Sequence, residues 1–195
     1  MTITIPDPYG KVRWRGGTCD RIDKVCFQVL EDKLQETATI FQLGYNPGGV
    51  AASSHTHDGG GAYDYWFPGL DSRTQERASR NVGIDAWKRD PPFPLHVHGI
   101  RHGSPTAHPE AKQQMANYSP GGGDGLWPLV VGDDPNPYRP DPIPTFGVAE
   151  YRAELQRRAR EDRLRDKLRR LGRDIKHLTR RKRKVRRQLK QLHKH

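Results

Sequence analysis

The last 45 residues differ sharply in composition from the rest of the chain, and this constrains the fold more than any other feature. Residues 151–195 hold 20 lysines and arginines against 5 acidic residues, whereas residues 1–150 hold 14 basic and 18 acidic residues. The net charge of +11 therefore arises in the C-terminal segment. Only 33% of the 195 residues are apolar, so we expect one domain with a core, followed by an appendage outside it.

Aliphatic residues in this basic segment are spaced alternately by four and three positions. A period of 3.5 residues is typical of a coiled-coil seam, so the pattern predicts self-association through residues 164–192, as a homo-oligomer. Gly172 weakens the seam, Lys182 interrupts it, and the alternative is a single solvated helix. The members of the seam are Leu164, Leu168, Leu171, Ile175, Leu178, Val185, Leu189 and Leu192.

The charge of residues 151–195 also predicts an anionic partner. An anionic wall polymer, an acidic protein and nucleic acid all fit, because contacts of lysine and arginine with phosphate do not depend on sequence. The stretch TRRKRKVRRQLK has no aromatic residue on which bases could stack, which argues against reading of single strands.

Periodicity divides the remainder into short elements typical of an α+β domain. We expect a small antiparallel sheet with flanking helices that carries a metal site, and a C-terminal basic coiled-coil helix. The boundaries are residues 1–130 for the domain, 131–147 for a Pro/Gly-rich linker and 148–195 for the basic helix. Helices are predicted over 18–35, 72–83 and 105–118, and strands over 37–45, 62–67, 84–88 and 94–100.

Local signals refine three of these predictions. Thr18 is the predicted N-cap of the first helix, and Ser72 with Gln75 forms a predicted capping box for the second. Cys19 and Cys26 are seven residues apart in a predicted helix, about 10 Å, which is too far for a disulfide. We expect both in the core. No run of about 18 apolar residues predicts a membrane span, and the N-terminus lacks the apolar core of a signal peptide.

The segment HTHDGGGAYDY, residues 55–65, predicts a metal site together with the later HVH. Catalytic zinc takes three ligands from His, Asp, Glu or Cys and keeps a fourth position open. His57 and Asp64 are separated by a glycine-rich loop that allows close backbone approach, and His96 and His98 share one face of a strand. Each signal is weak alone, but together they predict Zn²⁺ bound by His57, Asp64 and His98, with His96 beside the ion.

Three further residues are candidates for the surroundings of this site. Tyr63 and Tyr65 alternate around Asp64 and are interpreted either as substrate-binding residues or as core residues. His55 is the third candidate, because it lies two positions before His57 and can face the site.

These motifs resemble the zinc peptidases of the D-alanyl-D-alanine carboxypeptidase-like (M15-type) family, in its actinobacterial and phage branch. The resemblance rests on SSHTHDGGGAYDY, NVGIDAWKRD, PLHVHGI and YSPGGGDGL, and covers about residues 12–126. It implies hydrolysis of peptide bonds in peptidoglycan stems or cross-bridges. It also maps the family's zinc ligands to His57, Asp64 and His98, and a base or transition-state role to His96.

The chain departs from the family pattern at two places. His55 replaces a serine, and Leu95 stands three residues before His98, where many members carry a glutamate base. His96 can move the proton instead, since its unperturbed pKa is about 6.5, with Asp58 and Asp90 as reserve candidates.

Three functions follow as hypotheses. The first is a zinc-dependent peptidoglycan peptidase, associated with a phage as an endolysin or virion component. We expect it in the host cytoplasm until lysis, or on the virion, and acting on the cell wall. The second is a peptidase-fold assembly protein without turnover, organised by the coiled coil. The third is nucleic-acid binding through the basic helix.

Overall fold

The computed structural model describes residues 17–46, 55–89, 94–118 and 137–192, without the side chains of 188 and 190–192. It is an α+β fold with a four-stranded antiparallel sheet in the order β1-β2-β4-β3, which confirms the predicted class. The strands are β1 (Thr39–Leu43), β2 (Ala62–Trp66), β3 (Ile84–Arg89) and β4 (His96–Arg101), and the helices are α1 (Arg21–Leu34), α2 (Ser72–Arg80), α3 (Pro109–Tyr118) and α4 (Val148–Leu192).

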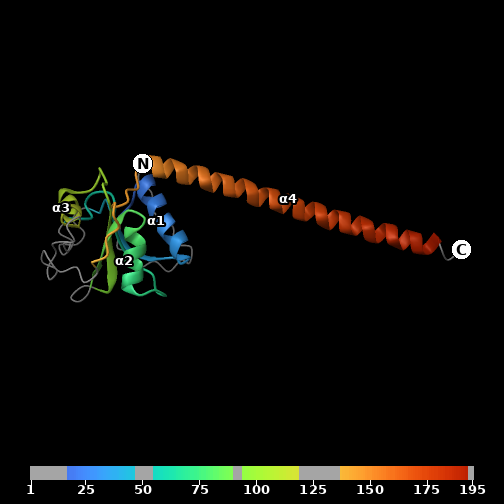
Figure 1. Ribbon diagram of the computed structural model, residues 1–195, viewed down its shortest axis with the longest axis horizontal. Helices are drawn as coiled ribbons and strands as arrows, with labels where there is room; N and C mark the ends of the chain where they lie inside the picture. Colours follow the sequence, from blue (N-terminus) through green and yellow to red (C-terminus); the bar gives the residue numbers. More distant parts are fainter. Residues whose placement is uncertain (1–16, 47–54, 90–93, 119–136, 193–195) are drawn as a thin grey trace. The chain divides into compact units, whose positions relative to one another are not determined.

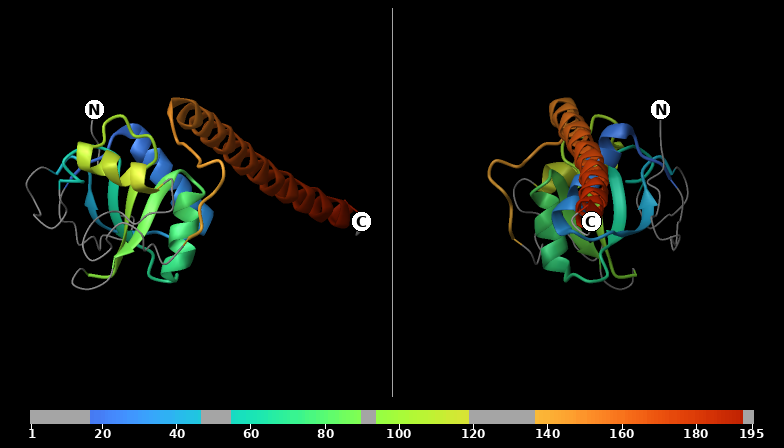
Figure 2. Two further views of the ribbon diagram at one scale, coloured as in Figure 1. Left: turned by 60° about the vertical axis from the view of Figure 1, so that its left-hand side comes forward. Right: turned by 90° about the vertical axis from the view of Figure 1, so that its right-hand side faces the viewer.

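The two faces of the sheet are covered by different helices. Figures 1 and 2 show α1 and α2 along one face and α3 on the other side. The larger core lies under α1 and α2, where Phe27 contacts the rings of Tyr63 and Tyr65. A smaller core joins α3 to Trp87 of β3. Because side chains alternate along a strand, residues next to each other on β2 and β4 belong to different cores.

Aspartates cap the first two helices, which corrects both predicted caps. The N-cap of α1 is Asp20 rather than Thr18, and it forms a reciprocal capping box with Asp23. The N-cap of α2 is Asp71 rather than Ser72, and its carboxylate accepts a hydrogen bond from the backbone N–H of Thr74. A short carboxylate is as good a cap as a hydroxyl, and an extended residue immediately before the helix can use it.

Both cysteines are buried and neither forms a disulfide, as predicted. Cys26 lies in α1, while Cys19 precedes the helix. Burial raises the pKa of the Cys19 thiol to about 12 and raises that of Cys26 as well, so neither is a reactive thiolate.

The chain divides into two compact units, residues 1–151 and 152–195. The described part of the second unit is α4 from residue 152 onward, and it exposes every seam residue whose side chain is described. None of the described helices combines the length and the low polarity needed to cross a bilayer. Of the predicted linker, residues 131–136 lie outside the described residues, and 137–147 contain no helix or strand.

A buried ion pair joins β3 to the end of β4. Asp85 is 1% exposed, and its Oδ2 lies 2.8 Å from His102 Nδ1. The hydrogen bond to Asp85 raises the pKa of His102 above 6.5, whereas burial raises the pKa of Asp85. The charged imidazole therefore stabilises the fold fully below about pH 6.5, and this contribution is lost as the pH rises through the raised pKa.

Replacing His102 with alanine is expected to lower the free energy of unfolding by about 1 kcal/mol at pH 6, because the buried Asp85 carboxylate loses its hydrogen-bond donor. The loss is modest because the His102 side chain is only partly buried. The loss should be smaller at pH 8. Urea unfolding followed by tryptophan fluorescence measures both values, with the exposed Lys112→Ala variant as control. An equal loss at the two pH values would contradict a contribution from the charged imidazole.

Candidate metal centre

The two central strands place Asp64 and His98 side by side. Asp64 of β2 and His98 of β4 are direct partners in the antiparallel register, so their side chains leave the same face of the sheet. Asp64 Oδ1 lies 2.8 Å from His98 Nδ1. This face is the one that α3 partly covers, opposite the aromatic core beneath α1. The pairing depends only on strand register, which explains why the sequence pattern already predicts it.

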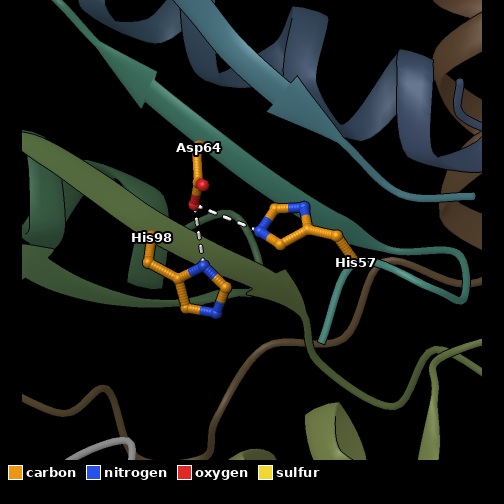
Figure 3. A group of neighbouring side chains, drawn as sticks. All are labelled: His57, Asp64 and His98. Atoms are coloured by element: carbon orange, nitrogen blue, oxygen red, sulfur yellow. Dashed lines mark hydrogen bonds and ion pairs between the residues drawn. The ribbon is translucent and has the colours of Figure 1, made fainter. Parts of the chain in front are cut away.

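His57 reaches the same point from the loop before β2 (Figure 3). Its Nε2 lies 3.3 Å from Asp64 Oδ1, and its side chain is 1% exposed. The glycines that follow allow the loop to pack tightly. A Cβ at Gly59 would lie 2.4 Å from the His108 backbone nitrogen, and Gly61 adopts a positive φ of 78°. Close packing within the chain therefore accounts for these glycines, without any contact to a ligand.

The hydrogen bonds of the imidazoles restrict which nitrogen of each ring carries a hydrogen. His57 Nδ1 donates to the carbonyl oxygen of Leu43 at 3.1 Å, so Nε2 of a neutral His57 presents a lone pair to Asp64 Oδ1. His98 lies between two acceptors, Gln114 Oε1 at 3.0 Å from Nε2 and Asp64 Oδ1 at 2.8 Å from Nδ1, and a neutral ring donates to only one of them. When His98 donates to Gln114, its Nδ1 also presents a lone pair to Asp64. Among the described residues, no hydrogen bond satisfies the buried His57 Nε2. A lone pair that faces a carboxylate requires a cation or a proton between them.

The donor set fits a metal ion. One ligand atom from each of His57, Asp64 and His98 lies within 4.8 Å of the other two, and the group could hold a metal ion. Metal-ligating histidines almost always donate their second nitrogen to a carbonyl or carboxylate oxygen, as both do in this cluster. Two imidazoles and one carboxylate leave a fourth tetrahedral position for another ligand.

The electrostatics of the cluster favour an ionised carboxylate. Burial opposes ionisation of Asp64, but His57 and His98 outweigh it and hold the pKa of Asp64 well below its usual range. Burial also opposes protonation of His57, yet Asp64 raises the pKa of His57 overall. The carboxylate therefore carries the negative charge that a cation would neutralise.

His96 completes the polar ring around Asp64. Its Nε2 lies 3.6 Å from Asp64 Oδ1, and its Nδ1 donates to the carbonyl oxygen of Pro94 at 2.6 Å. The available lone pair of His96 is consequently on Nε2, on the side of Asp64. Burial lowers the pKa of His96. The side chain is 11% exposed, compared with 3% for His98, so His96 is the more accessible of the two.

The other candidates lie elsewhere. Tyr63 and Tyr65 are fully buried under α1, and their hydroxyls contact the Asp23 carbonyl and the Ser79 hydroxyl. They flank Asp64 in a strand and so face away from it, which overturns their interpretation as substrate-binding residues in favour of the core. His55 is exposed, with a positive φ of 64°, and it lies 2.8 Å from Asp58. Asp90 lies outside the described residues.

Two buried amides near the cluster were not among the predicted site residues. Gln114 of α3 accepts from His98, and the helical pattern gave no reason to single it out. Gln42 of β1 is the register partner of Asp64 and is 3% exposed, and its Nε2 has no hydrogen-bond partner within the described part of the chain. Polar residues at core positions of a helix or strand are the signal that could have identified both.

Replacing Gln114 with alanine is expected to weaken metal binding by about 10–100-fold, because His98 loses the acceptor that fixes its tautomer and ring orientation. Competition titration against a chromophoric chelator measures the affinity. The neighbouring Gln113→Ala variant is the matched control, since Gln113 is exposed and bonds only to Asn117 among the described residues. Equal affinities of the two variants would contradict a supporting role for Gln114.

No protein-family model, curated protein or solved structure matches this chain in comparisons with known proteins.

Proposed function

We propose that the protein is a zinc-dependent peptidase that hydrolyses peptide bonds of peptidoglycan. The observation that carries the proposal is the convergence of His57 Nε2, His96 Nε2 and His98 Nδ1 on Asp64 Oδ1, at 3.3, 3.6 and 2.8 Å. His57, Asp64 and His98 would hold the ion. The resemblance to M15-type peptidases in the sequence motifs around these residues supplies the substrate class.

Zinc is the metal that a mixed imidazole and carboxylate set with an open position favours, and when bound it polarises a carbonyl and lowers the pKa of water. The chain's own contribution to proton transfer is His96. Because its Nδ1 hydrogen is committed to Pro94, Nε2 is the atom that accepts a proton from water and returns it to the leaving amine. This assigns to His96 the role that a glutamate has in many family members.

The cluster also restricts where a substrate carbonyl can lie. His57 and His98 are 1% and 3% exposed, whereas Asp64 is 14% and His96 11% exposed. A scissile carbonyl would therefore reach the site from the side of Asp64 and His96.

Digestion of actinobacterial cell walls by the purified full chain tests the proposal. Mass spectrometry should find released peptide fragments, and a chelator or the His57→Ala variant should abolish release while Gln113→Ala retains it. Zinc added after chelation should restore peptide release by the wild-type protein but not by His57→Ala. Peptide release that survives both the chelator and His57→Ala would overturn the zinc mechanism.

A second candidate is an assembly protein that retains the fold without turnover. Leu95, which is 47% exposed, stands where a glutamate base is expected, and this departure favours the second candidate. Stoichiometric zinc binding without release of wall fragments would support it. Fragment release that depends on His96 would exclude it, and His96→Ala is the variant that decides.

The basic helix supports a polyanion as a partner of either candidate. Residues 175–195 contain ten basic and no acidic residues. For the peptidase, we propose an anionic wall polymer, which would hold the enzyme at its substrate. Sedimentation with walls stripped of that polymer tests this. Binding to DNA of any sequence that falls steeply with salt, and that the triple variant Arg183→Gln, Lys184→Gln, Arg187→Gln weakens, would instead support nucleic acid.

A further inference from the structure

The seam of α4 is a long apolar strip on an otherwise charged helix. Its described aliphatic members are between 47% and 67% exposed, and they recur with a period of 3.5 rather than 3.6 residues. A strict seven-residue repeat keeps such a strip facing a partner helix that winds with it in a left-handed supercoil. The members are Leu164, Leu168, Leu171, Ile175, Leu178, Val185 and Leu189.

We propose that α4 pairs with α4 of a second copy of this chain as an antiparallel two-stranded coiled coil, with Leu164 opposite the partner's Leu189. The seam of one copy therefore packs against the seam of the other copy, which runs in the opposite direction. This proposal does not depend on the peptidase activity proposed above.

The register follows from the order of steps along the seam. The step from Leu164 to Leu168 is four residues, which makes Leu164 a d position and Leu168 an a position. In antiparallel pairs each a residue faces a d residue of the partner. With Leu164 opposite the partner's Leu189, every seam position from 164 to 189 has a counterpart.

This register also accommodates Lys182, the one polar position of the seam. Lys182 faces the partner's Leu171, so its methylene stem can pack while the ammonium reaches solvent. In a parallel pair the two Lys182 side chains would face each other at one a layer. Two ammonium groups in the same layer repel, so Lys182 disfavours the parallel arrangement.

Charges beside the seam favour the same register. Asp174 and Arg181 are g positions, and they make no ion pair among the described contacts of α4. In the antiparallel register each Asp174 lies beside the partner's Arg181, which gives two ion pairs per dimer. The same register brings Arg165 near the partner's Arg186, a like-charge contact at each end of the coil. In-register parallel pairing gives Arg160–Arg165 and Arg181–Arg186 contacts between chains, and no opposite-charge pair.

The antiparallel arrangement separates the most basic segments. Residues 180–187 hold seven basic and no acidic residues. In a parallel dimer these segments would lie side by side, whereas the proposed register offsets their centres by about 20 Å at 1.5 Å per residue. That offset exceeds the Debye length of about 8 Å at physiological ionic strength. It also places the two Arg152 residues, which directly follow the first unit in the chain, about 75 Å apart along the coil.

Oligomeric state tests the role of the seam. Sedimentation equilibrium of the full chain should show a dimer. Ile175→Glu should weaken dimerisation by more than about 100-fold, because it places two charges inside the seam. Lys176→Glu is the matched control, since it introduces the same side chain one residue away on the outer face, and it should leave the dimer intact. A monomeric wild-type chain, a higher oligomer, or equal behaviour of the two variants would overturn the proposal.

Distances between spin labels test the direction of pairing. Cys19 and Cys26 are buried, so labels can be attached at Arg163→Cys or His177→Cys on the outer face of α4. The proposed register separates the two Arg163→Cys labels by about 40 Å along the axis, and the two His177→Cys labels by about 2 Å. Electron paramagnetic resonance should therefore find a long distance at the first position and a short one at the second. Short distances at both would establish a parallel dimer and overturn the antiparallel register.

Charge reversal tests the register itself. Asp174→Arg and Arg181→Asp should each weaken the dimer about tenfold, since each replaces two attractive contacts with two repulsive ones. Combining the two changes in one chain restores opposite charges across the interface and should restore the affinity. Failure of the combined variant to recover would show that these residues do not face each other.

Discussion

Replacing Asp64 with asparagine is expected to abolish zinc binding while leaving the fold at least as stable as the metal-free wild type. Three imidazole nitrogens converge on Asp64 Oδ1. An amide of the same size removes the negative charge, so affinity should fall by more than about 100-fold, beyond the effect of losing a supporting residue. The same amide brings two N–H donors to nitrogens that need donors, so the metal-free cluster becomes better satisfied.

Zinc content after dialysis and competition titration measure the first effect, and thermal unfolding with and without a chelator measures the second. The wild-type melting temperature should fall on chelation, because zinc binds only the folded cluster. The Asp64→Asn variant should have the same melting temperature with and without the chelator. Asp58→Asn is the control for zinc affinity, since Asp58 contacts the exposed His55 in the adjacent turn. Retention of stoichiometric zinc with unchanged affinity by Asp64→Asn would remove Asp64 from the ligand set.

The α+β fold with an antiparallel sheet was predictable because its signals are local. The strand over residues 37–45 was predicted from β-branched and aromatic content, and β1 spans Thr39–Leu43. Helix limits were less accurate, because a cap depends on which nearby side chain reaches the free N–H groups. Thr18 and Asp20 are both acceptable caps in sequence, and only the path of the chain before α1 selects Asp20.

The juxtaposition of Asp64 and His98 could also be predicted from the sequence, because a strand pattern places His96 and His98 on one face of β4, and the strand register pairs His98 with Asp64. The hydrogen bonds that orient the histidines of the cluster could not be predicted from the sequence. Leu43 contributes through its backbone carbonyl, which every residue possesses, so no sequence signal marks it. Gln114 comes from a helix 16 residues away, and only the packing of α3 on the sheet brings its amide to His98.

Of the two interpretations of Tyr63 and Tyr65, the structure supports the core, and the reason is geometric. Flanking a predicted ligand in sequence suggests proximity to the site, but the period of a strand is two, so both rings point to the opposite face. That face is the core under α1. Burial of both tyrosines is therefore a consequence of placing Asp64 on the other side of β2.

Replacing Arg101 with methionine is expected to lower the free energy of unfolding by about 3–5 kcal/mol, because it leaves a charge buried without its partner. Asp23 is fully buried, and its Oδ1 accepts from Arg101 Nε at 2.6 Å. Burial raises the pKa of Asp23, and Arg101 opposes that shift. Arg101 also donates to the Phe146 carbonyl and the Ser104 hydroxyl, so one guanidinium joins α1, the end of β4 and the chain before α4.

Urea unfolding followed by tryptophan fluorescence measures this loss, and the exposed Arg73→Met variant controls for removal of a guanidinium. The double variant Asp23→Asn, Arg101→Met should recover much of the stability, because a neutral amide no longer needs a counterion. Zinc affinity should also fall in Arg101→Met, since Asp23 Oδ2 accepts from the Gly61 N–H immediately before β2. A loss below about 1 kcal/mol would mean that water or another residue satisfies Asp23. In that case the close packing of Gly59 and the backbone hydrogen bonds of Gly59 and Gly60 would hold the loop bearing His57, and Gly59→Ala would be the more damaging change.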